Sequence, residues 1–185
     1  VAGRDGDGWR LSGAKNFITH ASVGGVAVVV ARTSPGKDHH GISAFIVPLD
    51  VPGVVAGKHE DKVGMRVSDT ASLVLEDCRL GPEALLGREG EGFIQAMTVL
   101  DGGRISIAAL AVGIARGAFD AAVAYAKQRR QFGRPIGDFQ GIRFKLADMS
   151  TLLAAARLLT EHAADLKDAG AKSTLVSAQA KVYAS

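Results

Sequence analysis

Two hydrophobic patterns divide the chain. Up to residue 82, short apolar runs are separated by turn-forming residues such as Gly6-Asp7-Gly8 and Val51-Pro52-Gly53, a pattern typical of β-strands. The runs predicted to form strands are residues 9–11, 15–19, 26–31, 43–48, 54–57 and 72–76. Their spacing favours part of a small antiparallel β-barrel or sandwich.

From residue 90 onward the apolar residues recur three and four positions apart, as in Ile94, Met97 and Leu100, which indicates amphipathic helices. The predicted helices cover residues 92–129, 139–168 and a third segment from residue 171, with a break at 132–135. Because two or three long helices cannot bury all of their apolar faces against one another, we expect further helices or partner subunits to cover these faces.

The two patterns together predict an α+β fold. A β domain is expected over residues 1–82 and a helical domain over residues 83–185, with residues 78–86 as the linker. With 47% hydrophobic and 22% charged residues among 185, the composition is that of an ordinary globular protein.

Charge and cysteine content narrow the classes of partner. The formal net charge is only +3 and the basic residues are scattered, so no nucleic-acid partner is expected. The single cysteine, Cys78, cannot form an intramolecular disulfide, and no Cys/His cluster predicts a metal site. No apolar run reaches the roughly 18 residues that cross a bilayer, so no membrane partner is expected.

Because the chain begins at Val1 without a leader, we expect N-terminal sequence to be missing.

No nucleophile motif is recognisable along the chain. There is no GxSxG elbow, and His39-His40 lies in a polar loop where a solvated turn is expected. The carboxylate pairs Glu60-Asp61 and Glu76-Asp77 lie beside strand ends, where solvated edges or salt bridges are expected. These residues predict neither nucleophilic nor acid–base catalysis.

Two local patterns could bind a ligand. Phe17 and Thr19 end a predicted strand two residues apart, so alternation would place them on one face. Such a pair could stack a planar ring and hydrogen-bond its edge, although a core Phe beside a strand-end Thr is the commoner case. The second pattern is a cluster of arginines over residues 129–134, where a long helix stops. Favourable charge at the helix end and bidentate binding of a diphosphate explain it about equally well.

Five motifs, taken in order, resemble those of the acyl-CoA dehydrogenase family. They are Gly8-Trp9-x-Leu11-x-Gly13-x-Lys15-x-Phe17-Ile18-Thr19, Gly64-x-Arg66-x-Ser68-Asp69-Thr70, Leu86-Gly87-x-x-Gly90-x-Gly92-Phe93, Met97-x-x-Leu100-Asp101-x-Gly103-Arg104-Ile105 and Arg129-x-Gln131-Phe132-Gly133. The resemblance covers the whole chain and implies the family's middle β domain followed by its C-terminal four-helix-bundle domain. The runs 58–64 and 100–105 are most similar to short-chain and short branched-chain members.

The resemblance also implies roles for individual residues. Residues of the strand end and of the arginine cluster match positions that bind FAD, namely Phe17, Ile18, Thr19, Arg129, Arg130, Gln131, Phe132 and Gln140. The helix residues that match positions contacting acyl-CoA are Asp101, Gly102, Gly103 and Arg104. For Asp101 and Arg104 the alternative is a simple i,i+3 ion pair. The family often has Trp where this chain has Phe17 and Asn where it has His20, so ring stacking is retained better than polar contacts.

By the same resemblance the expected activity is that of an FAD-dependent acyl-CoA dehydrogenase of fatty acid β-oxidation, which converts an acyl-CoA thioester to the trans-2-enoyl-CoA. An electron-transfer flavoprotein is the expected acceptor, and a homotetramer built as a dimer of dimers is the expected assembly. The expected location is the bacterial cytoplasm or, in a eukaryote, the mitochondrial matrix. An acyl-CoA oxidase or flavin monooxygenase on the same scaffold, and a non-catalytic helical assembly module, stay open as alternatives.

No catalytic base is assigned within these residues. In most family members the glutamate that serves as base lies in a C-terminal motif, and in some it precedes the arginine matched by Arg104, where this chain has Gly103. We therefore expect the base to come from sequence beyond residue 185, and the chain alone to be inactive.

Overall fold

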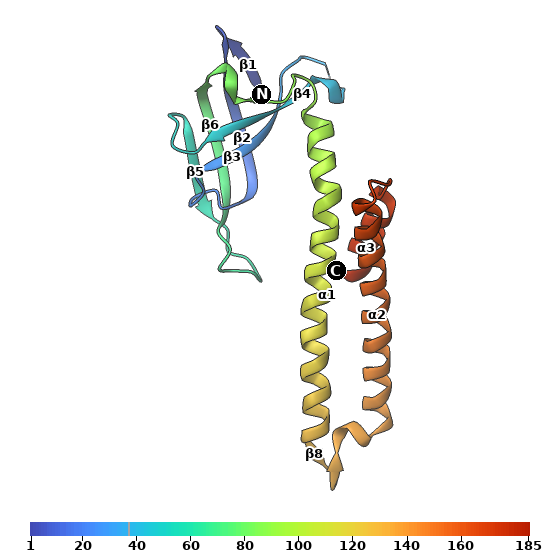
Figure 1. Cartoon of the computed structure of the whole chain (residues 1–185). Helices are drawn as coiled ribbons and strands as arrows, with labels where there is room; N and C mark the ends of the chain where they lie inside the picture. Colours follow the sequence, from blue (N-terminus) through green and yellow to red (C-terminus); the bar gives the residue numbers. More distant parts are fainter. Residues whose placement is uncertain (37) are drawn as a thin grey trace. The chain divides into compact units, whose positions relative to one another are not determined.

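The computed structural model describes residues 1–36 and 38–185, which form two compact units, Val1–Met97 and Thr98–Ser185. The first contains strands arranged in antiparallel sheets and the second contains long helices (Figure 1). This arrangement confirms the predicted α+β class. The domain boundary at residues 82/83 stays a prediction.

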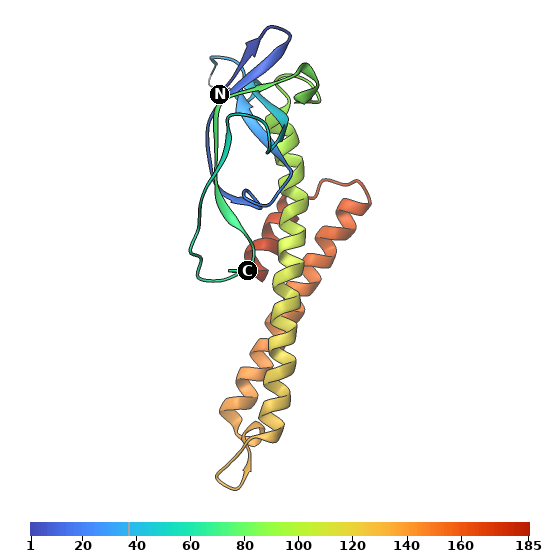
Figure 2. The same cartoon turned by 90° about the vertical axis from the view of Figure 1, so that its left-hand side faces the viewer.

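Two antiparallel sheets make up most of the first unit (Figure 2). The larger has the order β1-β2-β6-β5, formed by Ala2–Asp5, Gly8–Thr19, Thr70–Leu80 and Val54–His59. The smaller has the order β3-β4-β7, formed by Val26–Arg32, Ile42–Pro48 and Leu85–Leu86. Two short 3-10 turns, η1 (His39–Gly41) and η2 (Pro82–Ala84), lie between strands.

The strand boundaries differ from the prediction in three places. Residues 9–11 and 15–19 belong to one strand, β2, whose pairing with β6 shifts twice along its length, between Leu11 and Gly13 and between Lys15 and Ile18. The predicted linker at 78–86 is largely structured, because β6 continues to Leu80 and β7 pairs with β4. The edge strand β1 escaped prediction because its sequence, Ala-Gly-Arg-Asp, has no apolar alternation.

Side chains from both sheets form the core of the first unit. The rings of Trp9 on β2 and Phe45 on β4 meet edge to face with their centroids 5.0 Å apart. Leu11, Val47 and Cys78 are completely buried beside them. Burial raises the pKa of the Cys78 thiol, which favours its neutral form.

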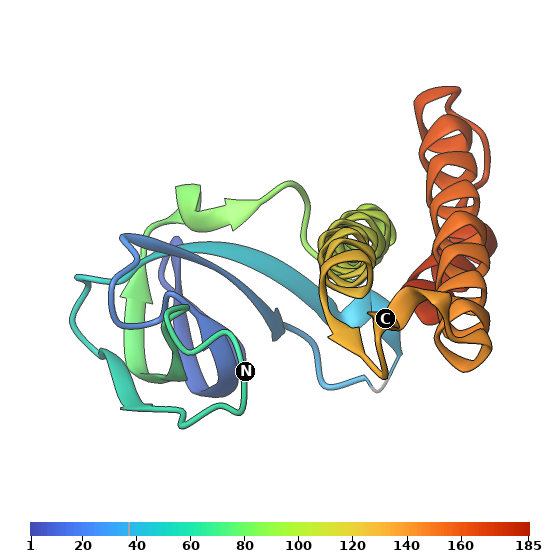
Figure 3. The same cartoon turned by 90° about the horizontal axis from the view of Figure 1, so that it is seen from below.

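The second unit is a helical hairpin with a short third helix (Figure 3). Its elements in order are the larger part of α1 (Gly92–Gln128), β8 (Arg130–Gln131), β9 (Arg134–Pro135), η3 (Ile136–Asp138), α2 (Gln140–Asp168) and α3 (Thr174–Ala184). The third helix begins three residues later than predicted. The N–H of Ala171 instead donates to the carbonyl of Leu166, and Gly170 adopts a φ of +66° that ends the preceding helix.

Three alanines, one from each helix, are fully buried against one another: Ala108, Ala163 and Ala180. Side chains this small permit close approach of the helices. The faces away from this contact stay apolar and exposed, as the sequence pattern predicted; Ile114 is 63% and Leu158 66% exposed.

Helix α1 bears on the expectation that no membrane partner is present. It contains an 18-residue window with a mean hydropathy of 1.6, which is long and apolar enough to cross a bilayer, and 6% of that window is buried. The expectation rested on uninterrupted apolar runs, whereas this window of α1 combines isoleucine, valine, leucine and alanine with widely spaced charges, and the absence of a membrane partner stays a prediction. By length and composition alone, α1 is the span found among the described residues.

Candidate functional site

The end of β2 holds Phe17 in an unusual backbone conformation. Its φ is +56°, and its side chain is 73% exposed. One extra residue on β2 lies between the pairs Lys15↔Leu73 and Ile18↔Ala71, so Phe17 belongs to a β-bulge. The premise that alternation places Phe17 and Thr19 on one face is therefore wrong, because the strand period is broken at Phe17.

This conformation is energetically costly for an aromatic residue. A non-glycine residue at positive φ costs on the order of 1–3 kcal/mol and persists where the surrounding structure imposes it. Here the pairing of Ile18 and Thr19 with β6 fixes the chain on one side. Strain combined with high exposure of an aromatic ring makes Phe17 a candidate ligand-binding residue.

Asp69 supports the turn that follows Thr19. Its Oδ2 accepts a hydrogen bond from the backbone N–H of Ser22 at 3.0 Å, and its backbone carbonyl accepts one from the N–H of His20, also at 3.0 Å. The hydrogen bond from Ser22 is the main reason that the pKa of this carboxyl lies below its usual value, and the nearby His59 lowers it further. Asp69 belongs to the motif of residues 64–70, but no local sequence pattern indicated that it supports the turn after Thr19.

A second aromatic residue at positive φ lies in the helical unit. Phe132 and Gly133 have φ values of +50° and +80° and form the two-residue turn between β8 and β9. The Phe132 side chain is 90% exposed. Its ring lies edge to face with Phe139, at a centroid distance of 6.1 Å.

The three predicted arginines have different surroundings. Arg130 donates to the carbonyl of Gly133 at 2.9 Å, and the guanidinium of Arg134 lies 4.2 Å from the centroid of the Phe139 ring. The side chain of Arg129 makes neither a hydrogen bond nor an ion pair within residues 1–36 and 38–185. Gln131 and Gln140 are exposed beside this hairpin and at the start of α2. Arg129 is therefore the arginine best able to accept an anionic ligand.

Asp101 and Arg104 form the i,i+3 ion pair that the sequence offered as the alternative. The other carboxylate oxygen of Asp101 accepts a hydrogen bond from the Thr174 hydroxyl at 2.7 Å. The ammonium group of Lys167 lies against Gly102, since a Cβ there would meet its Nζ, while the position of a Cβ on Gly103 is open. The ligand role of residues 101–104 stays a prediction, and Thr174 is a neighbour that no local pattern indicated.

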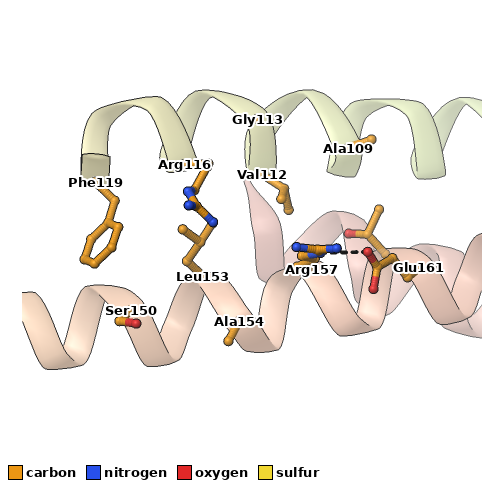
Figure 4. Close-up of a pocket in the computed structure, with 11 residues that line it drawn as sticks. Ala109, Val112, Gly113, Arg116, Phe119, Ser150, Leu153, Ala154, Arg157 and Glu161 are labelled. Atoms are coloured by element: carbon orange, nitrogen blue, oxygen red, sulfur yellow. Dashed lines mark hydrogen bonds and ion pairs between the residues drawn. The ribbon is translucent and has the colours of Figure 1, made fainter. Parts of the chain in front are cut away.

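A pocket of about 520 Å³ in the helical unit lies between α1 and α2 (Figure 4). Small and apolar residues line much of it, including Val112, Gly113 and Leu153. Its two arginines are already paired on their own helices, Arg116 with Asp120 and Arg157 with Glu161. None of the predicted site residues is among those lining it in the described part of the chain.

Two family descriptions match the chain and together cover most of it. "Acyl-CoA dehydrogenase, middle domain" matches residues 1–78, and "Acyl-CoA dehydrogenase, C-terminal domain" matches residues 90–185.

Curated relatives match the chain along its full length or nearly so. The short-chain specific acyl-CoA dehydrogenase of Rattus norvegicus mitochondria is 50% identical over 185 residues, which are 100% of this chain and 45% of that protein. The acryloyl-CoA reductase (NADH) of Anaerotignum propionicum is 50% identical over 95% of this chain and 44% of its own length. The chain thus spans less than half the length of these relatives.

Solved structures have the same fold. Butyryl-CoA dehydrogenase from Megasphaera elsdenii is 46% identical with a TM-score of 0.96, over 99% of this chain and 48% of the other. A chain from the structural study of the electron transferring flavoprotein of Acidaminococcus fermentans is 50% identical with a TM-score of 0.96, over 100% and 48%. A glutaryl-CoA dehydrogenase from Mycobacterium smegmatis in complex with FADH2 is 34% identical with a TM-score of 0.91, over 99% and 46%.

Replacing Phe17 with Asn should stabilise the ligand-free protein. Asn tolerates positive φ far better than Phe, and an exposed ring contributes little burial. We expect the free energy of unfolding of the full-length protein to rise by about 1 kcal/mol, measured by denaturant titration. Phe17→Val is the matched control and should be destabilising, because a β-branched residue is less compatible with positive φ. Equal stability of the Asn and Val variants would refute the assignment of strain.

Replacing Asp69 with Asn should change how stability depends on pH. Because folding lowers the pKa of Asp69, its contribution is present above the unfolded value of about 3.9 and is lost as the pH falls through the folded value. The stability difference between wild type and Asp69→Asn should therefore be largest near neutral pH and shrink below about pH 4. Denaturant midpoints from pH 7 to pH 3 measure this. Asp7→Asn is the control, and a difference for Asp69→Asn that stayed constant over this range would contradict the prediction.

Proposed function

The chain belongs to the acyl-CoA dehydrogenase family, and we propose that the full-length protein uses FAD to oxidise a short fatty acyl-CoA thioester to the trans-2-enoyl-CoA. Membership of the family confirms the resemblance seen in the five sequence motifs. The observation that carries the proposal is the exposed Phe17 at positive φ, at the end of the strand that matches the family's flavin-facing segment.

The residues at the end of β2 fit a flavin ring. Phe17 offers an exposed aromatic face, Ile18 is half-buried beside it, and Thr19 carries an exposed hydroxyl. In this proposal Phe17 and Ile18 pack against the isoalloxazine and Thr19 hydrogen-bonds its edge. Bound FAD would accept the hydride from the substrate's β-carbon.

The β8–β9 hairpin fits the phosphate and adenosine parts of FAD bound to a neighbouring subunit. Arg129 has a guanidinium without a partner in the described chain, which suits bidentate binding of a diphosphate. Arg130 and Gln131 add donors beside it, and the exposed Phe132 adds an apolar surface. Gln140 at the start of α2 would complete the set on the adenosine side.

Residues 101–104 of α1 are the proposed contact with the acyl-CoA substrate. The hydrogen bond from Thr174 and the ion pair with Arg104 hold the Asp101 carboxylate from two directions. That fixed carboxylate in turn limits the directions available to the Arg104 guanidinium. Gly103 presents open backbone without a side chain, which lets a ligand approach closely, and the Lys167 ammonium against Gly102 adds a cation beside it.

The base that removes the α-proton is proposed to lie elsewhere in the full-length protein. A thioester α-proton needs a carboxylate of raised pKa, and Gly103 offers no side chain at the alternative family position.

The proposal extends to partners and location. An electron-transfer flavoprotein is the proposed electron acceptor, which the similarity to a chain from such a study supports. The exposed apolar faces of α1 and α2 support assembly as a homotetramer. A mitochondrial relative and bacterial relatives support the mitochondrial matrix or the bacterial cytoplasm as the location.

Anaerobic titration with butyryl-CoA is the direct test of activity. The full-length protein should show a visible flavin band that bleaches on addition of substrate and recovers slowly in air. Rapid recovery with peroxide formation would instead support an acyl-CoA oxidase. A colourless protein that FAD cannot reconstitute would refute the proposal and favour the non-catalytic assembly module.

Replacing Arg129 with Gln should weaken FAD binding by about tenfold or more, since a charge-assisted bidentate contact is worth on the order of 1.5–3 kcal/mol. Fluorescence titration of the apoprotein with FAD measures the dissociation constant. Arg79→Gln removes an exposed guanidinium from β6 and should leave this constant unchanged. Equal affinities in the two variants would exclude Arg129 from the cofactor site.

A further inference from the structure

Three residues from separate parts of the first unit meet at one end of its four-stranded sheet. Ser22 lies in the loop after β2, His59 is the last residue of β5, and Asp69 directly precedes β6. The Ser22 hydroxyl is 3.5 Å from Nε2 of His59, and Nδ1 of the same ring is 2.7 Å from Oδ1 of Asp69. The three side chains therefore form a spatial chain of contacts, from the hydroxyl through the imidazole to the carboxylate.

This order matches the requirements of an activated serine. A serine hydroxyl is a weak nucleophile until a base can take its proton, and the base needs a third group to orient it. Nε2 of His59 faces the hydroxyl, and the opposite nitrogen, Nδ1, lies at ion-pair distance from the Asp69 carboxylate. A separation of 3.5 Å is long for a hydrogen bond, but such contacts are often loose without substrate and tighten when it binds.

The supporting carboxylate is well fixed. The Asp69 side chain is only 10% exposed, whereas that of His59 is 66% exposed. Its second oxygen, Oδ2, accepts the backbone N–H of Ser22. Asp69 thus anchors the serine loop through one oxygen and places the other at ion-pair distance from the histidine, while solvent and small molecules can reach the imidazole.

A small pocket lies beside the serine. Its volume is about 350 Å³, at the lower end for ligand sites. Ser22, Gly24 and Gly25 form one wall, and apolar side chains including Val54 and Leu73 form another. The backbone N–H of Gly25, a residue that lines this pocket, makes no hydrogen bond within the described residues, so it can donate to a substrate oxygen.

We propose that Ser22, His59 and Asp69 form a second reactive site, at which a small carboxylic ester or thioester transfers its acyl group first to Ser22 and then to water. The pocket size and its apolar wall select a short acyl group. None of the three residues belongs to the proposed flavin or acyl-CoA contacts, so this activity is separate from the oxidation proposed above.

In the first half of the reaction, Oγ of Ser22 bonds to the acyl carbon while the bond from that carbon to the leaving oxygen or sulfur breaks. The serine proton passes to Nε2 of His59 and on to the leaving group. In the second half, a water oxygen bonds to the acyl carbon and the bond to Ser22 breaks. His59 takes the proton from water and returns it to Oγ, so no oxidant or reductant is needed.

Treatment of the full-length protein with p-nitrophenyl acetate tests this site. Release of p-nitrophenolate should be accompanied by acetylation of Ser22, located by mass spectrometry of peptides from protein quenched in acid. Ser22→Ala and His59→Gln should each lower the release rate about 100-fold, the usual size of a general-base contribution. Because Asp69 is a positioning residue, Asp69→Asn should lower the rate constant for p-nitrophenolate release and leave the half-saturating ester concentration unchanged.

Ser12→Ala is the matched control. Ser12 also donates to a carboxylate, that of Asp77 at 3.1 Å, but within the described residues it has no contact with an imidazole. This variant should react like wild type, and thermal unfolding should verify that each variant is folded. Acetyl groups found on lysines but not on Ser22, or equal rates for wild type and Ser22→Ala, would overturn the proposal. The peptide map of wild-type protein decides the matter even if a variant fails to fold.

Discussion

The antiparallel pairing of β2 with β6 is the constraint on which the first unit depends. It runs from Trp9 opposite Leu80 to Thr19 opposite Thr70, and its shift between Lys15 and Ile18 produces the bulge that contains Phe17. The same register brings Asp69, directly before Thr70, against the loop that follows Thr19. One strand pair therefore sets both the proposed flavin contact and the proposed serine site, because a slip by one residue would turn every side chain to the other face.

Much of the fold followed from sequence pattern, and the exceptions have physical reasons. Long periodic helices and turn-bounded strands carry repeated local signals, so their existence was predictable. The bulge at Phe17 arises from pairing with residues more than 50 positions away, and no local period encodes it. The same is true of the contact between Asp101 and Thr174 and of the meeting of Ser22, His59 and Asp69. The family resemblance supplied ligand positions, but the backbone conformation that distinguishes Phe17 and Phe132 required coordinates.

The helical unit depends on a different kind of contact. Ala108, Ala163 and Ala180 bring the three helices together over a small buried area, while large residues such as Val99 and Val182 face outward. Alanine burial contributes little hydrophobic free energy, so the unit gains most of its stability from whatever covers those outer faces. This also explains why α1 combines the hydropathy of a membrane span with the expected role of a bundle helix.

Phe17 and Phe132 both hold exposed rings on a left-handed backbone. A ligand that covers these rings adds stability to a folded state that otherwise carries the strain alone, and the gain grows with ligand concentration. Intracellular proteases act on the unfolded fraction, so the lifetime of such a protein in the cell would follow the supply of its ligand. If FAD is that ligand, as proposed, the cellular supply of FAD would then set how much of the protein survives.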